Sequence, residues 1–142
     1  TPLGLVPLEP PPAEVLAMPG VVVSDRAHEQ EHSLEVHLPF LQLTLKDFSI
    51  VPLVVGDASA EEICEVIEAL WTGPDTLVIV SSDLSHYHRY AECQERDRAT
   101  SAAIAGLDED AIGPEDACGA YPLRGLLAPR RRDGDFLGLG FL

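Results

Sequence analysis

The predicted fold depends on one stretch, Thr76-Leu-Val-Ile-Val-Ser-Ser-Asp-Leu-Ser-His-Tyr-His88. Its first five residues are apolar or β-branched, which is the pattern of a strand buried on both faces of a parallel sheet. Loops that leave the carboxyl ends of such strands commonly carry functional groups. Here the loop places the Asp83 carboxylate three residues before the His86 imidazole. Both are candidate catalytic residues, although the spacing alone fits a helix-capping aspartate and a surface histidine equally well.

The residues before this stretch predict a strand–helix–strand unit. Residues 48–55 read as a second strand, with Pro52 at a bulge or a sheet margin. Ser59 and Glu62 form a capping-box pattern at the start of a helix, which Gly73 and Pro74 end. The resulting βαβ unit should have a right-handed crossover. We therefore predict an α/β fold, a mostly parallel sheet flanked by helices.

Weaker patterns predict the remaining elements. The lead-in is rich in proline, which has no N–H to give to a sheet. Further helices are predicted at 13–17, at 32–45 with Pro39 kinking the helix or splitting it in two, at 89–105 and at 107–112. A tight turn at Gly119 and Pro122 should lead into a last helix through Leu126 and Leu127, and short strands are predicted at 21–23 and 136–142.

Composition narrows the class of protein. With 46% hydrophobic residues and 142 in all, the chain should form one packed domain. It lacks an apolar run long enough for a membrane span and a basic, apolar leader. A net charge of −15, with clustered basic residues only at 130–132, argues against a nucleic-acid partner. Three widely spaced cysteines do not make a disulfide framework and indicate a reducing cytoplasm.

The three cysteines are predicted to differ in role. Cys64 and Cys93 fall within predicted helices and read as core residues. Cys118 stands just before a predicted helix, where the helix dipole favours a thiolate. A structural thiol does not need that position, so Cys118 is the functional candidate.

A second motif, His28-Glu-Gln-Glu-His32, matches the zinc-protease pattern, in which two histidines on one helix face bind zinc. Polar residues precede it and no third ligand is evident, so an accidental match is the stronger interpretation. On a helix, His32 and His37 would point about 140° apart and could not share a metal unaided. His32, beside Glu31, is the better candidate for a site.

Three blocks of the sequence together resemble the Memo family, called AmmeMemoRadiSam system protein B in prokaryotes. They are Glu31-His-Ser-Leu-Glu-Val-His-Leu-Pro-Phe40, Val80-Ser-Ser-Asp-Leu-Ser-His86 and Cys118-Gly-Ala-Tyr-Pro-Leu123. Ile50-Val-Pro-Leu-Val-Val-Gly56 and the opening Thr1-Pro-Leu-Gly4 also fit the family pattern. The resemblance thus spans nearly the whole chain.

The resemblance implies a three-layer fold related to the LigB-like class III extradiol dioxygenases, which hold non-haem Fe(II). Cys118 then looks like the family's cysteine metal ligand, in the place of a dioxygenase carboxylate. Asp83 and His86 look like the pocket acid and the acid/base histidine, with His86 also a candidate ligand, and His32 belongs to a block near the cofactor pocket. A thiolate with imidazole suits Fe(II) or Cu, and Zn less well.

The departures from the family pattern are equally informative. Family members are longer, and their two histidine ligands lie in Pro-His-Ala-Gly and Pro-Ser-His motifs that do not occur here. We therefore expect residues 1–142 to form a single α/β domain, part of a longer Memo-like domain, with a metal site that needs further ligands. Exposed sheet edges would promote a homo-oligomer.

Two functions remain open at this stage. One is a metal site of redox or oxygenase-like character, which would make the protein a metal-dependent oxidoreductase. The other is a non-catalytic interaction module that binds a peptide or small-molecule ligand in the same pocket.

Overall fold

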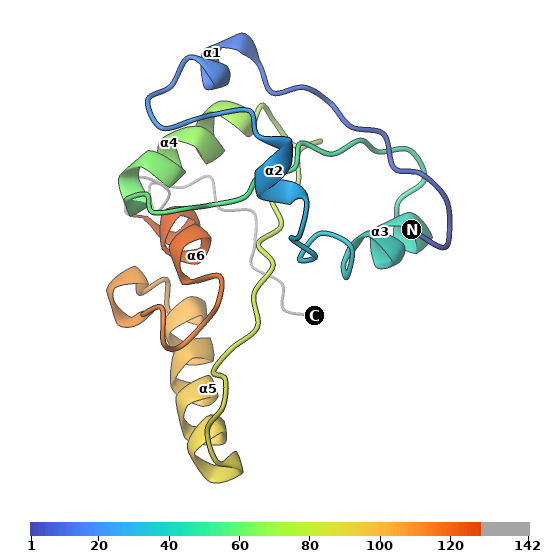
Figure 1. Cartoon of the computed structure of the whole chain (residues 1–142). Coiled ribbons are helices and arrows are strands. Elements are labelled where there is room, and N and C mark those ends of the chain that lie inside the picture. The colour runs from blue at the N-terminus through green and yellow to red at the C-terminus, as the bar shows by residue number, and fades with distance from the viewer. Residues whose placement is uncertain (129–142) are drawn as a thin grey trace. The chain divides into compact units, whose positions relative to one another are not determined.

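The structure is a computed structural model that describes residues 1–128 (Figure 1). The chain divides into two units, one formed by Thr1–Val54 and a second that begins at Val55. None of the helices in residues 1–128 is both long and apolar enough to cross a membrane. The prediction of one domain over residues 1–142 remains a prediction.

Helices make up the regular structure of the described residues, so the predicted α/β fold with a mostly parallel sheet is wrong. The β pairing found in residues 1–128 is one isolated parallel bridge between Leu8 and Ile50. In this bridge the Glu9 N–H donates to the Ile50 carbonyl at 2.9 Å, and the Ile50 N–H donates to the Pro7 carbonyl at 3.0 Å. The strands predicted at 21–23, 48–55 and 76–80 form no sheet in the described structure, and that predicted at 136–142 lies outside the described residues.

Residues 76–80 show why the βαβ prediction failed. Val78 and Val80 pack against the core, whereas Leu77 and Ile79 are 67% and 45% exposed. The segment therefore buries one face and not both. Its apolar side chains indicate burial, but a strand also requires hydrogen bonds from a neighbouring strand, and the side-chain pattern does not specify that neighbour.

The first unit contains three short helices. They are α1 (Ala13–Leu16), α2 (Asp25–His28) and α3 (Leu38–Thr44). The helix predicted over 32–45 begins only at Leu38, because residues 33–37 form turns. Pro39 lies in the first turn of α3, where its missing N–H costs no helical hydrogen bond. Pro39 thus helps to start a helix and does not kink one.

The second unit contains the longer helices, largely as predicted. They are α4 (Ala60–Leu70), α5 (Tyr90–Ala105) and α6 (Ala120–Leu127), with a short 3-10 helix, η1 (Glu109–Ala111), between α5 and α6. The capping box of α4 is present: the Glu62 N–H donates to Ser59 Oγ at 3.2 Å, and the Ser59 N–H donates to Glu62 Oε2 at 2.9 Å. The Ser59 N–H lowers the pKa of the Glu62 carboxyl below its ordinary value.

The core of the second unit consists of two apolar clusters on α6. One joins α6 to α5 and to the residues before α6, and its buried members are Ile104, Ile112, Ala117, Ala120, Leu123 and Leu127. The other joins α6 to α4 through Ile63, Ile67 and Leu126. Val80 packs against both clusters, so the chain segment between α4 and α5 runs along α6 (Figure 1).

Candidate functional site

The candidate site lies where the loop 81–86 meets the turn that leads into α6. Val80 and Leu84, which flank residues 81–83, pack against the apolar cluster that joins α5 to α6 (the α5–α6 cluster). Ala117, next to Cys118, is 2% exposed and belongs to the same cluster. Because one apolar cluster anchors both segments, their backbones are held together, while the Cys118 residue remains exposed.

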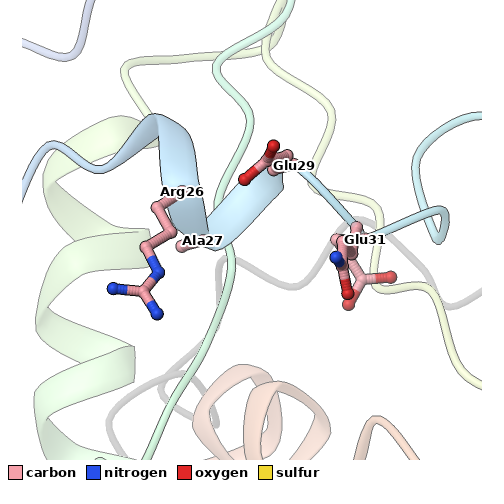
Figure 2. Close-up of a pocket in the computed structure, with 5 residues that line it drawn as sticks. Arg26, Ala27, Glu29 and Glu31 are labelled. Carbon is pink, nitrogen blue, oxygen red and sulfur yellow. The ribbon is translucent and has the colours of Figure 1, made fainter.

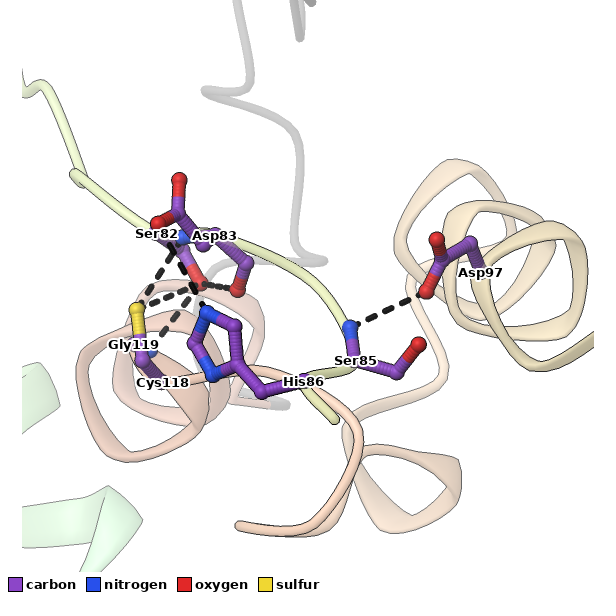
Figure 3. Close-up of polar contacts among 7 residues, drawn as sticks. All are labelled: Ser82, Asp83, Ser85, His86, Asp97, Cys118 and Gly119. Atoms are coloured by element: carbon purple, nitrogen blue, oxygen red, sulfur yellow. Dashed lines mark hydrogen bonds and ion pairs between the residues drawn. The ribbon is translucent and has the colours of Figure 1, made fainter. Parts of the chain in front are cut away.

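Backbone hydrogen bonds join the two segments directly (Figure 3). The Cys118 N–H donates to the Asp83 carbonyl at 3.1 Å, and the Asp83 N–H donates back to Cys118 Sγ at 3.0 Å. The Gly119 N–H donates to Ser82 Oγ at 2.9 Å, and that hydroxyl also lies 3.8 Å from Cys118 Sγ. The sulfur is thereby fastened to the loop that carries the predicted acid and imidazole.

Gly119 permits this close approach. A Cβ at this position would lie 2.7 Å from both the Ser81 carbonyl oxygen and Ser82 Cβ, which is too close for any side chain. The φ of Gly119 is −91°, a value open to most residues. The glycine is therefore needed for space and not for an unusual backbone conformation.

Asp83 and His86 form a loose pair at the surface. His86 Nε2 lies 3.6 Å from Asp83 Oδ2, and their side chains are 48% and 85% exposed. An exposed pair of this kind contributes little to stability. It can nevertheless orient the imidazole ring, because the carboxylate faces one of the two ring nitrogens.

A second contact holds the loop from the side of α5. The Ser85 N–H donates to Asp97 Oδ1 at 3.0 Å. The Ser85 hydroxyl and the Ser85 N–H lower the pKa of the Asp97 carboxyl below its ordinary value. The hydroxyl is buried without a partner of good hydrogen-bond geometry, so the N–H is the firmer of the two contacts.

The structure thus brings three of the predicted site residues together in the second unit: Asp83, His86 and Cys118. Their proposed roles as catalytic residues and metal ligands remain predictions. His32 belongs to the first unit, where it is exposed and its N–H donates to Glu31 Oε1 at 2.8 Å. Its role in binding a cofactor also remains a prediction.

The zinc-protease alternative lacks the helix that it requires. Helix α2 ends at His28, and the chain turns before it reaches His32. The two histidines therefore do not share a helix face. The Glu31 carboxylate faces its own backbone, where the Ser33 and His32 N–H groups lower its pKa.

A shallow hollow of about 390 Å³ beside these residues is lined by Arg26, Ala27, Glu29, Gln30 and Glu31 (Figure 2).

The donor set suits a metal only in part. A cysteine sulfur and an imidazole are the ligand types that Fe, Cu and Zn accept. Among residues 1–128, however, no group of three or more histidine, cysteine, aspartate or glutamate side chains is placed to hold a metal ion. The described residues do not complete a metal site, and the expectation that further ligands are needed stays a prediction.

Sequence reasoning missed two residues that build the site. Ser82 connects the loop to Gly119 across 37 positions of sequence, and Asp97 reaches back 12 positions to Ser85. Asp97 resembles any polar residue on an exposed helix, so the sequence offered no signal for its role. Ser82 lies in the loop after residues 76–80, where the local pattern does not distinguish its hydroxyl from those of Ser81 and Ser85.

Comparison with known proteins decides the family. A family model described as Memo-like protein matches residues 1–115. The chain belongs to the Memo family. The predicted membership is therefore confirmed, although the match ends before Cys118, so the correspondence of that cysteine rests on its own motif.

Curated Memo-family relatives match a large part of the chain. A MEMO1 family protein of Archaeoglobus fulgidus is 40% identical over 115 residues, which cover 76% of this chain and 43% of that protein. One of Methanosarcina barkeri is 32% identical over 146 residues, covering 94% of this chain and 55% of the relative. One of Methanopyrus kandleri is 36% identical over 117 residues. The chain spans about half the length of these relatives, and no solved structure matches it.

Proposed function

We propose that Cys118 and His86, with Asp83 beside them, supply part of a metal site of redox or oxygenase-like character. The observation that carries this proposal is the 3.0 Å hydrogen bond from the Asp83 N–H to Cys118 Sγ. It fastens a sulfur ligand to the loop that carries the imidazole. Fe(II) or Cu fits this donor pair best and Zn less well. Cys118 and His86 do not fill the coordination sphere of the metal by themselves, so other residues supply the remaining ligands, and a second copy of the chain is one source of them.

The residues present can perform two chemical tasks themselves. The His86 imidazole is a group of the kind that serves as a general acid or base, and its Nε2 lies 3.6 Å from Asp83 Oδ2, so the carboxylate can orient the ring. The Asp83 N–H offers Cys118 Sγ a hydrogen bond that a thiolate accepts more strongly than a thiol. The site therefore combines an imidazole with a sulfur that accepts a backbone hydrogen bond, and both are groups that can bind a metal ion.

Metal analysis of the purified full chain tests the proposal. We expect the parent protein to bind added Fe(II) or Cu, and Cys118→Ala to lose at least about tenfold in affinity, because even outer-shell changes weaken metal sites by about 10–100-fold. Cys93→Ala is the matched control: its thiol donates to the His88 carbonyl at 3.5 Å, and binding should be unchanged. Failure of the parent to bind, or equal binding by Cys118→Ala, would contradict the proposal.

One observation favours the second function, a non-catalytic interaction module. Two aromatic side chains beside the site loop, Tyr87 and Tyr90, are 106% and 78% exposed. Exposed tyrosines are enriched in the contact surfaces of proteins. Under this function, a peptide or small-molecule ligand would shift the NMR signals of residues 83–90 in protein that carries no metal.

A further inference from the structure

Two non-glycine residues of the described chain have a left-handed backbone. The φ of Tyr87 is 63° and that of Leu107 is 56°. L-amino acids other than Asn and Asp rarely adopt this conformation, because Cβ crowds the following carbonyl group. At each of these two residues, other interactions must therefore offset the steric cost of the left-handed backbone.

Leu107 has a clear explanation at the end of α5. The Leu107 N–H donates to the Ile104 carbonyl at 3.1 Å, and the Asp108 N–H donates to the Ala103 carbonyl at 2.9 Å. This pair of bonds is the Schellman arrangement, in which the residue after the cap takes the left-handed conformation. Leu107 also packs against the α5–α6 cluster, so cap and core together compensate its backbone.

Tyr87 has neither a helix cap nor core packing to offset the cost of its left-handed backbone. It precedes α5, which begins at Tyr90, and its side chain is fully exposed. The ring contact found for it is with His86, at a centroid separation of 5.9 Å and an interplanar angle of 49°. That separation lies within the range of favourable aromatic pairs. The ring of the residue at the strained position thus lies near the imidazole of the candidate site, while the residue itself stays fully exposed.

The chain is anchored on both sides of Tyr87. Upstream, the Ser85 N–H is held by Asp97 at 3.0 Å. Downstream, His88 Nδ1 lies 3.1 Å from Glu92 Oε1 on the first turns of α5. The left-handed turn is therefore imposed between two fixed points, which is how a strained residue persists.

We propose that Tyr87 is a positioning residue for His86. Its left-handed backbone turns the chain between Ser85 and His88, and its ring lies 5.9 Å from the imidazole, so that Nε2 of His86 faces Asp83. The functional value of this arrangement depends on the proposed function, in which His86 transfers protons. The arrangement itself is a property of the loop and can be measured without any metal.

Three variants of the metal-free full chain test this inference. Tyr87→Phe keeps the ring, whereas Tyr87→Gly and Tyr87→Asn accept the left-handed backbone and remove the ring. The readouts are the NMR cross-relaxation between the His86 ring and the Asp83 β-protons, and the melting temperature. We expect Tyr87→Phe to retain the His86–Asp83 signal and the other two variants to lose it. Their melting temperatures should be unchanged or a few degrees higher, because the strain is relieved.

Two results would overturn the inference. One is a His86–Asp83 signal that survives in both Tyr87→Gly and Tyr87→Asn, since the ring would then have no part in holding the imidazole. The other is loss of the signal in Tyr87→Phe, or a fall in melting temperature in all three variants, which would make Tyr87 a structural residue. A failure of metal binding would contradict the proposed function but leave this measurement unaffected.

Discussion

At the scale of single residues, Asp97 should make the stability of the site loop depend on pH. Its carboxylate accepts the Ser85 N–H, and the Ser85 hydroxyl and N–H lower its pKa below the ordinary value of 3.8. A carboxyl whose pKa is lower in the folded state adds stability above its unfolded pKa. That stability is lost as the pH falls through the folded pKa. Protonation of Asp97 should therefore loosen the site loop in acid.

We predict that Asp97→Asn will remove this pH dependence. The parent should be more stable than the variant near neutral pH, and the difference should shrink as the pH falls below the ordinary carboxyl pKa of 3.8 and through the lower pKa of Asp97 in the folded state. Urea unfolding of both proteins between pH 7 and pH 3 measures the difference. A stability gap of the same size at every pH would show that the carboxylate charge plays no part.

The sequence made some of these residues predictable and others not. Asp83 and His86 lie three residues apart in one polar loop, and Cys118 is distinguished by its place before a predicted helix as well as by the Memo resemblance. Their proximity in the structure depends on the apolar anchors Val80 and Leu84, which had been assigned to a strand and its following loop. The hydrogen bond from the Ser85 N–H to Asp97 joins the site loop to α5. Such a contact between two elements cannot be predicted from the sequence unless their packing is known.

At the scale of elements, the packing of α4 on α6 depends on a glycine inside a helix. Gly125 lies within α6, where alanine would normally be better by about 1 kcal/mol. A Cβ at Gly125 would, however, lie 2.3 Å from Ile63 Cγ2 on α4. The absent side chain thus sets how closely the two helices approach.

We predict that Gly125→Ala will destabilise the protein, by about 1–3 kcal/mol, because overpacking outweighs the gain in helix propensity. Ile63→Ala alone should cost about 2–5 kcal/mol through the cavity that it leaves. The double variant should cost less than the sum, since the new methyl group fills part of that cavity. Denaturant unfolding of the four proteins measures the coupling, and additive costs would refute the close contact.

Helices were more predictable than strands for a physical reason. The hydrogen bonds of a helix join residues four apart, so the Ser59–Glu62 capping box and the apolar stripe of α4 were sufficient evidence for it. A strand takes its hydrogen bonds from another segment, whose identity the local pattern does not contain. The segment 76–80 is apolar and packs on α6 through one face, yet it pairs with no strand in residues 1–128.

At the scale of the whole molecule, buried side chains are distributed unevenly. In the first unit, residues 1–54, Val15 is the one buried residue. In the described part of the second unit, α4, α5 and α6 contribute most of the buried side chains. Since apolar burial is the main source of stability, each unit should have its own resistance to local unfolding.

We predict that amide hydrogen exchange will separate the two units. Amides in α4, in α6 and in the last turns of α5 should exchange slowly, at rates close to the limit set by global unfolding, because their opening exposes the apolar clusters. Amides of α1, α2 and α3 should exchange much faster, because little buried surface opposes their opening. Mass spectrometry of peptides from the intact chain, over seconds to hours, measures both sets. If peptides of the first unit were protected as strongly as those of α4 and α6, the burial in the structure would not explain where stability resides.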